Sequence, residues 1–210
     1  MAGHDDAVEH AAVGHAAVGH AAVGCPAAAE AGPPEPTARL FVGVWPPPDV
    51  VAVLASLERP SLDALRWTRP DQWHVTLAFL GNVVLSGVTE VGSALVKAAG
   101  HGVPAPEARL GPMTERLGRR VLCLPVHGLD EMADRVRRAL GGVLPDAGLD
   151  APFRGHLTLA RARGRRAVPP SLSGVPLAAR WQVGELSLVR TELDSSGARY
   201  TTLVTATVGS

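Results

Sequence analysis

Residues 73–80 read Trp-His-Val-Thr-Leu-Ala-Phe-Leu, and residues 155–161 read Gly-His-Leu-Thr-Leu-Ala-Arg. Both stretches are short and apolar, so we expect two strands that share a His-aliphatic-Thr-Leu pattern. Side chains alternate along a strand, so the His and the Thr of each stretch project from the same face. Two such strands side by side would present two imidazoles and two hydroxyls to one cleft.

A longer repeat leads up to each pattern. Arg39 begins a predicted strand 35 residues before His74, and Arg120 begins another 36 residues before His156, each followed by a helix. The predicted elements are strands at 39–45, 73–80, 120–126 and 155–161, helices at 50–57, 88–98 and 129–140, and a closing hairpin of 181–190 and 200–208 that turns at 195–197. The duplication predicts an α+β fold with two pseudo-symmetric lobes, each an antiparallel sheet with helices, around a central cleft that carries the two H-x-T motifs.

The first part of the chain has a different composition. Residues 10–25 repeat His-Ala-Ala-Val-Gly three times, and prolines follow. We expect residues 1–37 to be a low-complexity, disordered extension and residues 38–210 to be the bilobal domain. The repeat also spaces four candidate metal ligands five residues apart, namely His10, His15, His20 and Cys25. Five residues advance a helix by about 140°, so successive ligands share no helical face, and a solvated Ala/Gly repeat is favoured over a metal-binding tract.

The overall charge separates this chain from one class of nucleic-acid-binding proteins. The 210 residues include 20 basic and 20 acidic side chains, so the formal net charge is zero. Residues 1–36 hold five acids and no Lys or Arg, which leaves a net charge of +5 on the remainder. A neutral chain is not typical of proteins that coat nucleic acid through bulk electrostatics. The sequence has no run of 18 apolar residues and no basic leader, so we expect a cytoplasmic protein that does not enter a membrane.

Several enzyme classes lack their sequence signatures here. Lys97 is the single lysine and does not belong to a phosphate-binding loop. The patterns H-E-x-x-H, G-x-S-x-G and G-x-G-x-x-G are absent. Cys25 and Cys123 form no C-x-x-C pair, so neither a zinc ribbon nor a disulfide scaffold is indicated. We therefore expect an activity that uses no cofactor.

The paired H-x-T motifs suit proton transfer at a phosphodiester. The unperturbed pKa of histidine, about 6.5, lets His74 and His156 serve as acid or base near neutrality. Thr76 and Thr158 would add hydroxyl donors for the nonbridging phosphate oxygens, where negative charge builds up. Neither motif contains a carboxylate, so a two-metal mechanism has no evident ligands and we expect a site without metal. One such histidine alone would be interpreted as an ordinary strand residue, whereas the matched pair indicates function.

One further residue follows each motif at the same offset. Phe79 lies five residues after His74, and Arg161 lies five residues after His156. In an ideal strand this odd spacing turns both side chains away from the cleft, so a bend or bulge is needed to bring Arg161 to a phosphate. Phe79 is most simply a core residue, although near such a cleft it could stack on a base. The arginines that follow, equally compatible with a solvated loop, are Arg163, Arg165 and Arg166.

These residues resemble the signature blocks of bacterial RNA 2',3'-cyclic phosphodiesterases, which belong to the two-histidine phosphoesterase superfamily and were historically called 2'-5' RNA ligases. The matching blocks lie at 39–44, 73–81, 152–161, 184–193 and 197–200, so the resemblance covers about residues 38–208. Two positions depart from the family pattern. Gly155 stands where many relatives have proline, which could loosen the entry to the second strand, and Asn82 stands where Glu is frequent.

The resemblance implies a metal-independent enzyme that opens the 2',3'-cyclic phosphate of an RNA end or nucleotide to a 2'-phosphate. We also expect a monomer with no obligate protein partner. His156 would be the base on water and His74 the acid on the departing 3'-oxygen. Thr76, Thr158 and Arg161 would hold the phosphate. The arginines near Arg161 favour the same assignment, because their charge would lower the pKa of the nearer His156.

Three other functions remain open from the sequence. One is the reverse-type reaction, ATP-independent 2'-5' joining of RNA. Another is a related phosphoesterase that acts on a different cyclic or linear nucleotide. The third is a non-catalytic module that binds RNA ends, although the presence of all four H-x-T side chains favours an enzyme.

Overall fold

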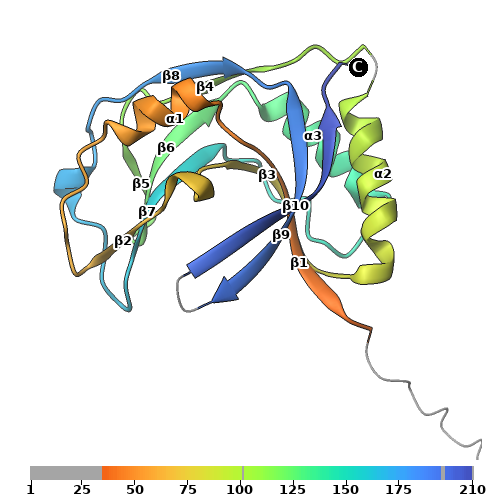
Figure 1. The fold of residues 1–210 in the computed structure, drawn as a ribbon, viewed down its shortest axis with the longest axis horizontal. Helices are drawn as coiled ribbons and strands as arrows, with labels where there is room; N and C mark the ends of the chain where they lie inside the picture. Colours follow the sequence, from red (N-terminus) through yellow and green to blue (C-terminus); the bar gives the residue numbers. More distant parts are fainter. Residues whose placement is uncertain (1–34, 101, 195–196, 210) are drawn as a thin grey trace, which may run out of the picture. The chain divides into compact units, whose positions relative to one another are not determined.

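The computed structural model describes residues 35–100, 102–194 and 197–209 (Figure 1). The chain divides into two units, Met1–Pro34 and Glu35–Ser210. The four candidate metal ligands of the predicted extension lie outside the described residues, and so do residue 101 and two residues of the predicted turn at 195–197. The second unit carries every residue of the predicted catalytic cleft.

Strands outnumber helices in the described residues. The strands are β1 (Thr37–Val44), β2 (Leu65–Trp67), β3 (Val75–Val84), β4 (Glu107–Leu110), β5 (Glu115–Leu117), β6 (Val121–His127), β7 (His156–Ala162), β8 (Ala179–Gln182), β9 (Glu185–Asp194) and β10 (Gly197–Thr207). The helices are α1 (Pro48–Ala55), α2 (Val88–Ala99) and α3 (Asp130–Gly141), with short 3-10 helices at Pro70–Gln72, Leu85–Gly87 and Pro170–Leu172. The first turn of α1 begins with proline, whose missing N–H costs nothing at that position.

The strands form a curled antiparallel sheet in the order β10-β9-β1-β3-β7-β6-β4-β8, with β2 paired to β7 and β5 paired to β6. The two halves of this sheet meet at one residue pair, Val75 opposite Leu157. Outward from the junction, β3-β1-β9-β10 on one side matches β7-β6-β4-β8 on the other. The predicted α+β fold with two pseudo-symmetric halves is confirmed.

The helix of each strand–helix–strand repeat packs on the opposite half of the sheet. Helix α1 follows β1 in the chain but contacts β8, whereas α3 follows β6 but contacts β3 and α2 (Figure 1). Helix α2 contacts β9 and β10. Because α1 and α3 each pack on the half of the sheet that does not contain the preceding strand, they connect the two halves. The repeat in the sequence does not reveal this crossing.

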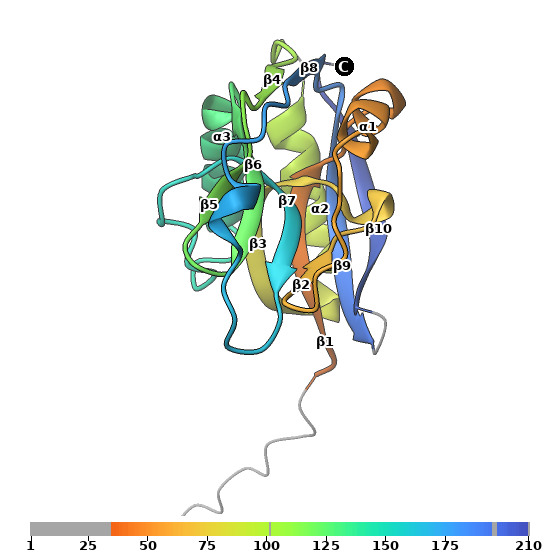
Figure 2. The ribbon, with the colours of Figure 1, turned by 90° about the vertical axis from the view of Figure 1, so that its left-hand side faces the viewer.

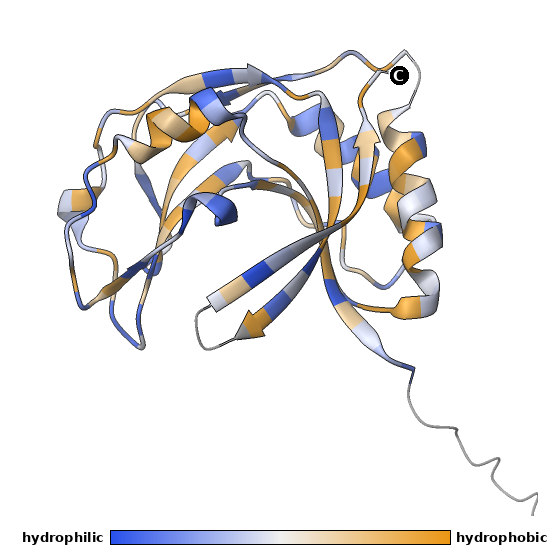
Figure 3. Cartoon of the chain, in the orientation of Figure 1, coloured by the Kyte–Doolittle hydropathy of each residue, from blue (hydrophilic) through white to orange (hydrophobic). Residues whose placement is uncertain are grey.

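A hydrophobic core cluster extends through both halves of the sheet. Apolar residues line the strands and the sheet-facing sides of the helices (Figure 3). Leu40, Leu122, Leu157 and Leu186 are fully buried, and each leucine buried in this way contributes about 1.5–3 kcal/mol. Within the described ranges, no helix is long and apolar enough to cross a bilayer.

The closing hairpin differs from the prediction. The predicted strand at 181–190 is two strands in different halves of the sheet, because β8 pairs with β4 while β9 pairs with β1 and β10. The break falls at 183–184, directly after the last bond that extends the β4–β8 pairing, in which the Val183 N–H donates to the Pro106 carbonyl at 2.9 Å. Strands β2, β4 and β5, with three or four residues each, are too short to leave a periodic pattern in the sequence.

Candidate active site

A β-bulge follows the threonine of each H-x-T motif. In the β1–β3 pair, Gly43 lies opposite Thr76 and Val42 opposite Ala78, so Leu77 has no partner. In the β6–β7 pair, the partners skip the leucine after Thr158 in the same way. Each bulge places a leucine and the following alanine side by side in the core and shifts the alternation by one residue.

The bulges bring the residues at offset five back to the motif side of the sheet. Arg161 and Phe79 are both exposed, and both line the same cavity as the two histidines. The bend that the sequence required for Arg161 is therefore present. Phe79 is 48% exposed, so it is not the core residue that its simplest interpretation suggested.

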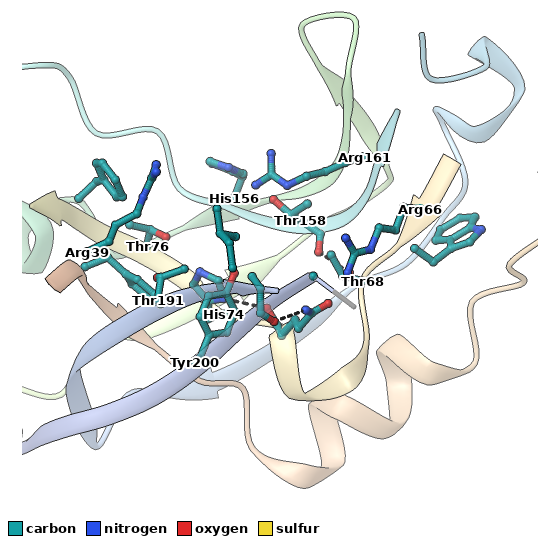
Figure 4. A pocket seen from close by; sticks show the side chains of 17 residues that line it. Arg39, Arg66, Thr68, His74, Thr76, His156, Thr158, Arg161, Thr191 and Tyr200 are labelled. Atoms are coloured by element: carbon teal, nitrogen blue, oxygen red, sulfur yellow. Dashed lines mark hydrogen bonds between the residues drawn. The ribbon is translucent and has the colours of Figure 1, made fainter. Parts of the chain in front are cut away.

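The two motifs lie antiparallel to each other at the junction of the halves. Because Val75 pairs with Leu157, His74 lies across from Thr158, and Thr76 lies across from His156. Val75 and Leu157 are fully buried, so the histidines and threonines project from the other face. The two imidazoles thus occupy diagonal corners of a four-residue site, each facing a threonine of the other motif (Figure 4).

Both imidazole rings are held by the same local hydrogen bond. The Nδ1 atom of His74 lies 2.8 Å from the Gln72 carbonyl oxygen, and that of His156 lies 2.8 Å from the Arg154 carbonyl oxygen. A carbonyl oxygen can only accept, so Nδ1 carries the proton and donates it in both rings. Nε2 is the nitrogen left to exchange a proton with a substrate in each ring.

The motifs open into a cavity of about 590 Å³ between β2, β3, β7 and the β9–β10 hairpin. The lining residues, drawn in Figure 4, are Arg39, Phe41, Arg66, Trp67, Thr68, Gln72, His74, Thr76, Phe79, His156, Thr158, Arg161, Thr191, Leu193, Gly197, Ala198 and Tyr200. This described lining includes three arginines and no carboxylate. Its charge therefore favours an anionic ligand.

Comparison with known proteins assigns the family. A family model described as LigT-like phosphoesterase matches residues 42–118. The RNA 2',3'-cyclic phosphodiesterase of Thermus thermophilus is 31% identical over 185 residues, which cover 79% of this chain and 87% of that protein. The chain belongs to the LigT-like phosphoesterase family. It is therefore an enzyme of the class that hydrolyses phosphodiesters.

Solved structures share the fold of this phosphoesterase. The crystal structure of TT0787 of Thermus thermophilus matches with a TM-score of 0.70 and 29% identity, over 81% of this chain and 98% of that one. The crystal structure of E. coli LigT complexed with 3'-AMP matches with a TM-score of 0.60 and 25% identity, over 83% and 99% of the two chains. The similarity thus spans nearly the whole of both solved proteins.

His74 of this phosphoesterase lies among aromatic rings. The Phe41 ring stacks on it with centroids 4.7 Å apart, and the Tyr200 and Trp45 rings lie at 5.0 and 5.3 Å. Burial of His74 in these surroundings lowers its pKa from 6.5 to about 4. The hydrogen bond to the Gln72 carbonyl opposes this shift, while the positive charge of Arg161 adds to it. The sequence placed this effect of Arg161 at His156, whereas in the structure the charge of Arg161 lowers the pKa of His74.

Thr68 joins the two H-x-T motifs. Its backbone N–H donates to the Leu159 carbonyl at 2.8 Å, and its hydroxyl lies 2.9 Å from the Thr158 carbonyl oxygen and 2.8 Å from that of Leu159. The same hydroxyl accepts a hydrogen bond of 3.0 Å from the indole N–H of Trp73, the residue before His74. Thr68 therefore links the backbone at the second bulge to the residue that precedes the first histidine.

We expect Thr68→Val to lower kcat about tenfold with little change in KM. Valine keeps the shape of threonine but leaves the buried indole N–H of Trp73 without a partner, which costs roughly 1–3 kcal/mol. The resulting shift would change the spacing between the two imidazoles, and catalysis is sensitive to such displacements. Thr68→Ser keeps the hydroxyl and should restore kcat. Steady-state kinetics of both variants would contradict this role if kcat stayed normal in Thr68→Val, or if Thr68→Ser were equally impaired.

The entry to the second motif needs glycine in this structure. A Cβ at Gly155 would run into the Val126 carbonyl oxygen, and the Val126 N–H donates to the Gly155 carbonyl at 2.9 Å. Glycine therefore permits a close approach and a hydrogen bond to β6 directly before His156, and the expectation that Gly155 could loosen this entry stays a prediction.

Reasoning from the sequence missed 11 of the 17 residues that line the cavity. Five of these eleven are Arg39, Arg66, Gln72, Thr191 and Tyr200. The alternation of β1, in which Leu40 and Val42 are fully buried, could have indicated that Arg39 faces the cavity. The guanidinium of Arg39 lies over the Phe79 ring, 4.9 Å from its centroid. The other four depend on the pairing of segments that are far apart in the sequence.

Gln72 fixes His74 relative to the β9–β10 hairpin. Its side-chain amide donates to the Ala198 carbonyl at 2.7 Å, and its own backbone carbonyl accepts the Nδ1–H of His74. The hairpin thereby brings Tyr200 against the first histidine. Across the described part of the chain, no cluster of three or more His, Cys, Asp or Glu side chains is arranged to hold a metal ion.

Proposed function

We propose that this phosphoesterase hydrolyses RNA 2',3'-cyclic phosphate ends to 2'-phosphomonoesters by acid–base catalysis with His74 and His156, without a metal. The observation that carries the proposal is the diagonal pair of imidazoles, each with Nδ1 tied to a carbonyl and Nε2 left for the substrate, in a cavity lined by arginines. The name of the Thermus relative supports the choice of a cyclic phosphate as substrate.

In this mechanism His156 is the base. Its Nε2 takes a proton from water while the water oxygen forms a bond to phosphorus. The bond from phosphorus to the 3'-oxygen breaks, and Nε2 of His74 gives its proton to that oxygen. The products are a 2'-phosphomonoester and a free 3'-hydroxyl. The reaction ends with a proton on His156 and none on Nε2 of His74, and exchange with solvent restores both.

The remaining side chains hold the phosphate. The hydroxyls of Thr76 and Thr158 make no hydrogen bond within the described residues, so both can donate to nonbridging oxygens. Arg161 adds a positive charge on the same face of β7. Phe79 lies beside the stacked Arg39 and offers an aromatic surface to the base.

In the proposed mechanism, His74 becomes protonated when the substrate binds. Its lowered pKa means that it is neutral near pH 7 in the free enzyme. A phosphate anion next to the ring favours imidazolium and therefore raises the pKa. Titration of His74 by NMR with and without a 2'-nucleotide should show this rise. If the pKa of His74 did not move, His74 would be the base and the roles would be reversed.

The substrate class is tested with a panel of phosphoesters. Purified enzyme would be incubated, with EDTA present, with 2',3'-cyclic nucleotides, 3',5'-cyclic nucleotides and linear dinucleotides. We expect hydrolysis of the 2',3'-cyclic compounds alone. Preferential cleavage of another member would make this chain a related phosphoesterase with a different substrate, and turnover of none would exclude the proposed reaction.

The pH dependence of kcat/KM should report the environment of His74. Activity requires one neutral and one protonated imidazole, and kcat/KM reports ionisations of the free enzyme. That one proton can rest on either ring in the free enzyme, so the acidic limb appears where a second proton binds to the pair, which is at the His74 pKa of about 4. We therefore expect the acidic limb near pH 4, well below the usual histidine range.

Variants of Tyr200 test whether burial of His74 sets the pH at which the acidic limb appears. Tyr200→Ala should admit water to His74, raise its pKa and move the acidic limb to higher pH. Tyr200→Phe keeps the ring next to His74, so the limb should stay in place. An acidic limb near pH 6.5 in the wild type, or one that Tyr200→Ala does not shift, would contradict this account.

A further inference from the structure

Arginines continue along the sheet beyond the catalytic cavity. Strands β2 and β7 run side by side with β6 and β5 in Figure 2, and Arg66 lies directly opposite Arg161 in the β2–β7 pair. The pairing extends past the end of β7, because the Arg163 N–H donates to the Ala64 carbonyl at 2.8 Å and Arg163 Nε donates to the Leu65 carbonyl at 3.1 Å.

The alternation of β7 places Arg163 on the cavity side. Ala162 is buried in the core, so Arg161 and Arg163 project from the opposite face of the sheet. The loop that follows is drawn as hydrophilic in Figure 3, and it adds two exposed arginines. We call Arg66, Arg161, Arg163, Arg165 and Arg166 the arginine surface.

Four members of this surface form no ion pair with a described acid, namely Arg161, Arg163, Arg165 and Arg166. Like charges directly opposite each other in a sheet, as Arg66 and Arg161 are, destabilise the pair. Elsewhere the chain does pair its arginines with acids, as in Arg69–Asp71, Arg109–Glu107, Arg137–Asp134 and Arg190–Glu192. The arrangement is that of a surface suited to a bound polyanion.

The chemistry of the proposed substrate supplies such a polyanion. A 2',3'-cyclic phosphate stands at the 3' end of an RNA, so the rest of the strand must leave the cavity. Arg66 and Arg161 line the cavity, and Arg163 continues the row outward from it. Backbone phosphates of the departing strand would therefore meet the arginine surface directly.

We propose that the arginine surface binds backbone phosphates upstream of the cyclic end, so that the enzyme prefers oligonucleotides to mononucleotides. This inference rests on the proposed function. Phosphate contacts of this kind raise affinity independently of base sequence and make it depend on salt concentration. The members outside the cavity should act on the binding of long substrates alone.

The test compares two substrates, a 2',3'-cyclic mononucleotide and a ten-nucleotide RNA with the same cyclic end. We expect the wild type to show a KM for the RNA at least about tenfold lower than for the mononucleotide. The triple variant Arg163→Gln, Arg165→Gln, Arg166→Gln should lose this preference while its kcat/KM for the mononucleotide stays within about twofold. Its slope of log affinity against log salt should be shallower by roughly 2, since each lost contact to a single strand removes about 0.7.

A control variant removes three exposed arginines outside the cavity, Arg135→Gln, Arg138→Gln and Arg180→Gln, and should behave as the wild type. The double variant Arg165→Gln, Arg166→Gln leaves the Arg163 hydrogen bond to Leu65 intact and should show a smaller change in the same direction. Equal KM values for both substrates in the wild type, or an unchanged salt slope in the triple variant, would overturn the proposal.

Measurements of RNA binding distinguish a failure of this inference from a failure of the proposed function. A fluorescent ten-nucleotide RNA ending in a 2'-phosphate would be titrated with the same variants by anisotropy. If the enzyme hydrolysed neither cyclic substrate but bound this RNA in an arginine-dependent way, the proposed function would fail and the surface would stand. If it hydrolysed the mononucleotide but the wild type and the triple variant bound the RNA equally well, the surface would fail and the function would stand.

Discussion

His74→Ala and His156→Ala are each expected to lower kcat by about 10²–10⁴-fold, equivalent to roughly 3–5 kcal/mol of barrier. Each substitution removes a proton donor or acceptor at one corner of the site and leaves the phosphate-binding groups in place. KM should therefore change much less than kcat. Steady-state kinetics with a 2',3'-cyclic nucleotide would measure both parameters.

The double variant tests whether the two histidines act as a unit. If both proton transfers occur in one step, loss of the second histidine costs little once the first is gone. We expect the double variant to be far less impaired than the product of the single losses. Multiplicative losses would show that His74 and His156 work in separate steps, and a normal rate in either single variant would remove that histidine from the mechanism.

Thr76→Val and Thr158→Val should give the next largest losses, about 10- to 10²-fold in kcat each. Loss of one donor to a developing negative charge typically costs this much or more. Each threonine lies across from the histidine of the other motif, so each should support proton transfer at that corner. Valine preserves the volume and the β-branched shape, which separates the hydroxyl from packing.

The control for these variants is Thr205→Val, an exposed position on β10 outside the cavity. It should leave kcat and KM unchanged. A thermal melt of all three variants would show whether folding is intact. Wild-type kcat in Thr76→Val and Thr158→Val, or an equal loss in Thr205→Val, would contradict the phosphate-binding role.

The grouping of the four H-x-T side chains on one face could be predicted from the sequence because it depends on local spacing. Within each motif, two residues of separation along a strand put His and Thr on one face without any knowledge of the rest of the fold. The need for a bulge before Arg161 could reach the cleft also followed from this alternation. The structure then shows bulges after both threonines, which places Phe79 in the cavity as well.

The remainder of the site depends on contacts between distant segments. Arg66 enters through the three-residue strand β2, and Tyr200 enters through the β9–β10 hairpin, so neither has a local signal that points to the cavity. Thr68 acts through backbone carbonyls about 90 residues away, which no sequence pattern encodes. The crossing of α1 and α3 to opposite halves is likewise set by packing between elements rather than by their own periodicity.

The most direct test of the central claim is phosphorus NMR of a 2',3'-cyclic nucleotide incubated with the enzyme in excess EDTA. Metal-independent catalysis by His74 and His156 predicts complete conversion to the 2'-monophosphate, at the same rate as without EDTA. Loss of activity in EDTA that Mg²⁺ or Mn²⁺ restores would contradict the two-histidine mechanism. Formation of the 3'-monophosphate would contradict the assignment of His74 to the 3'-oxygen.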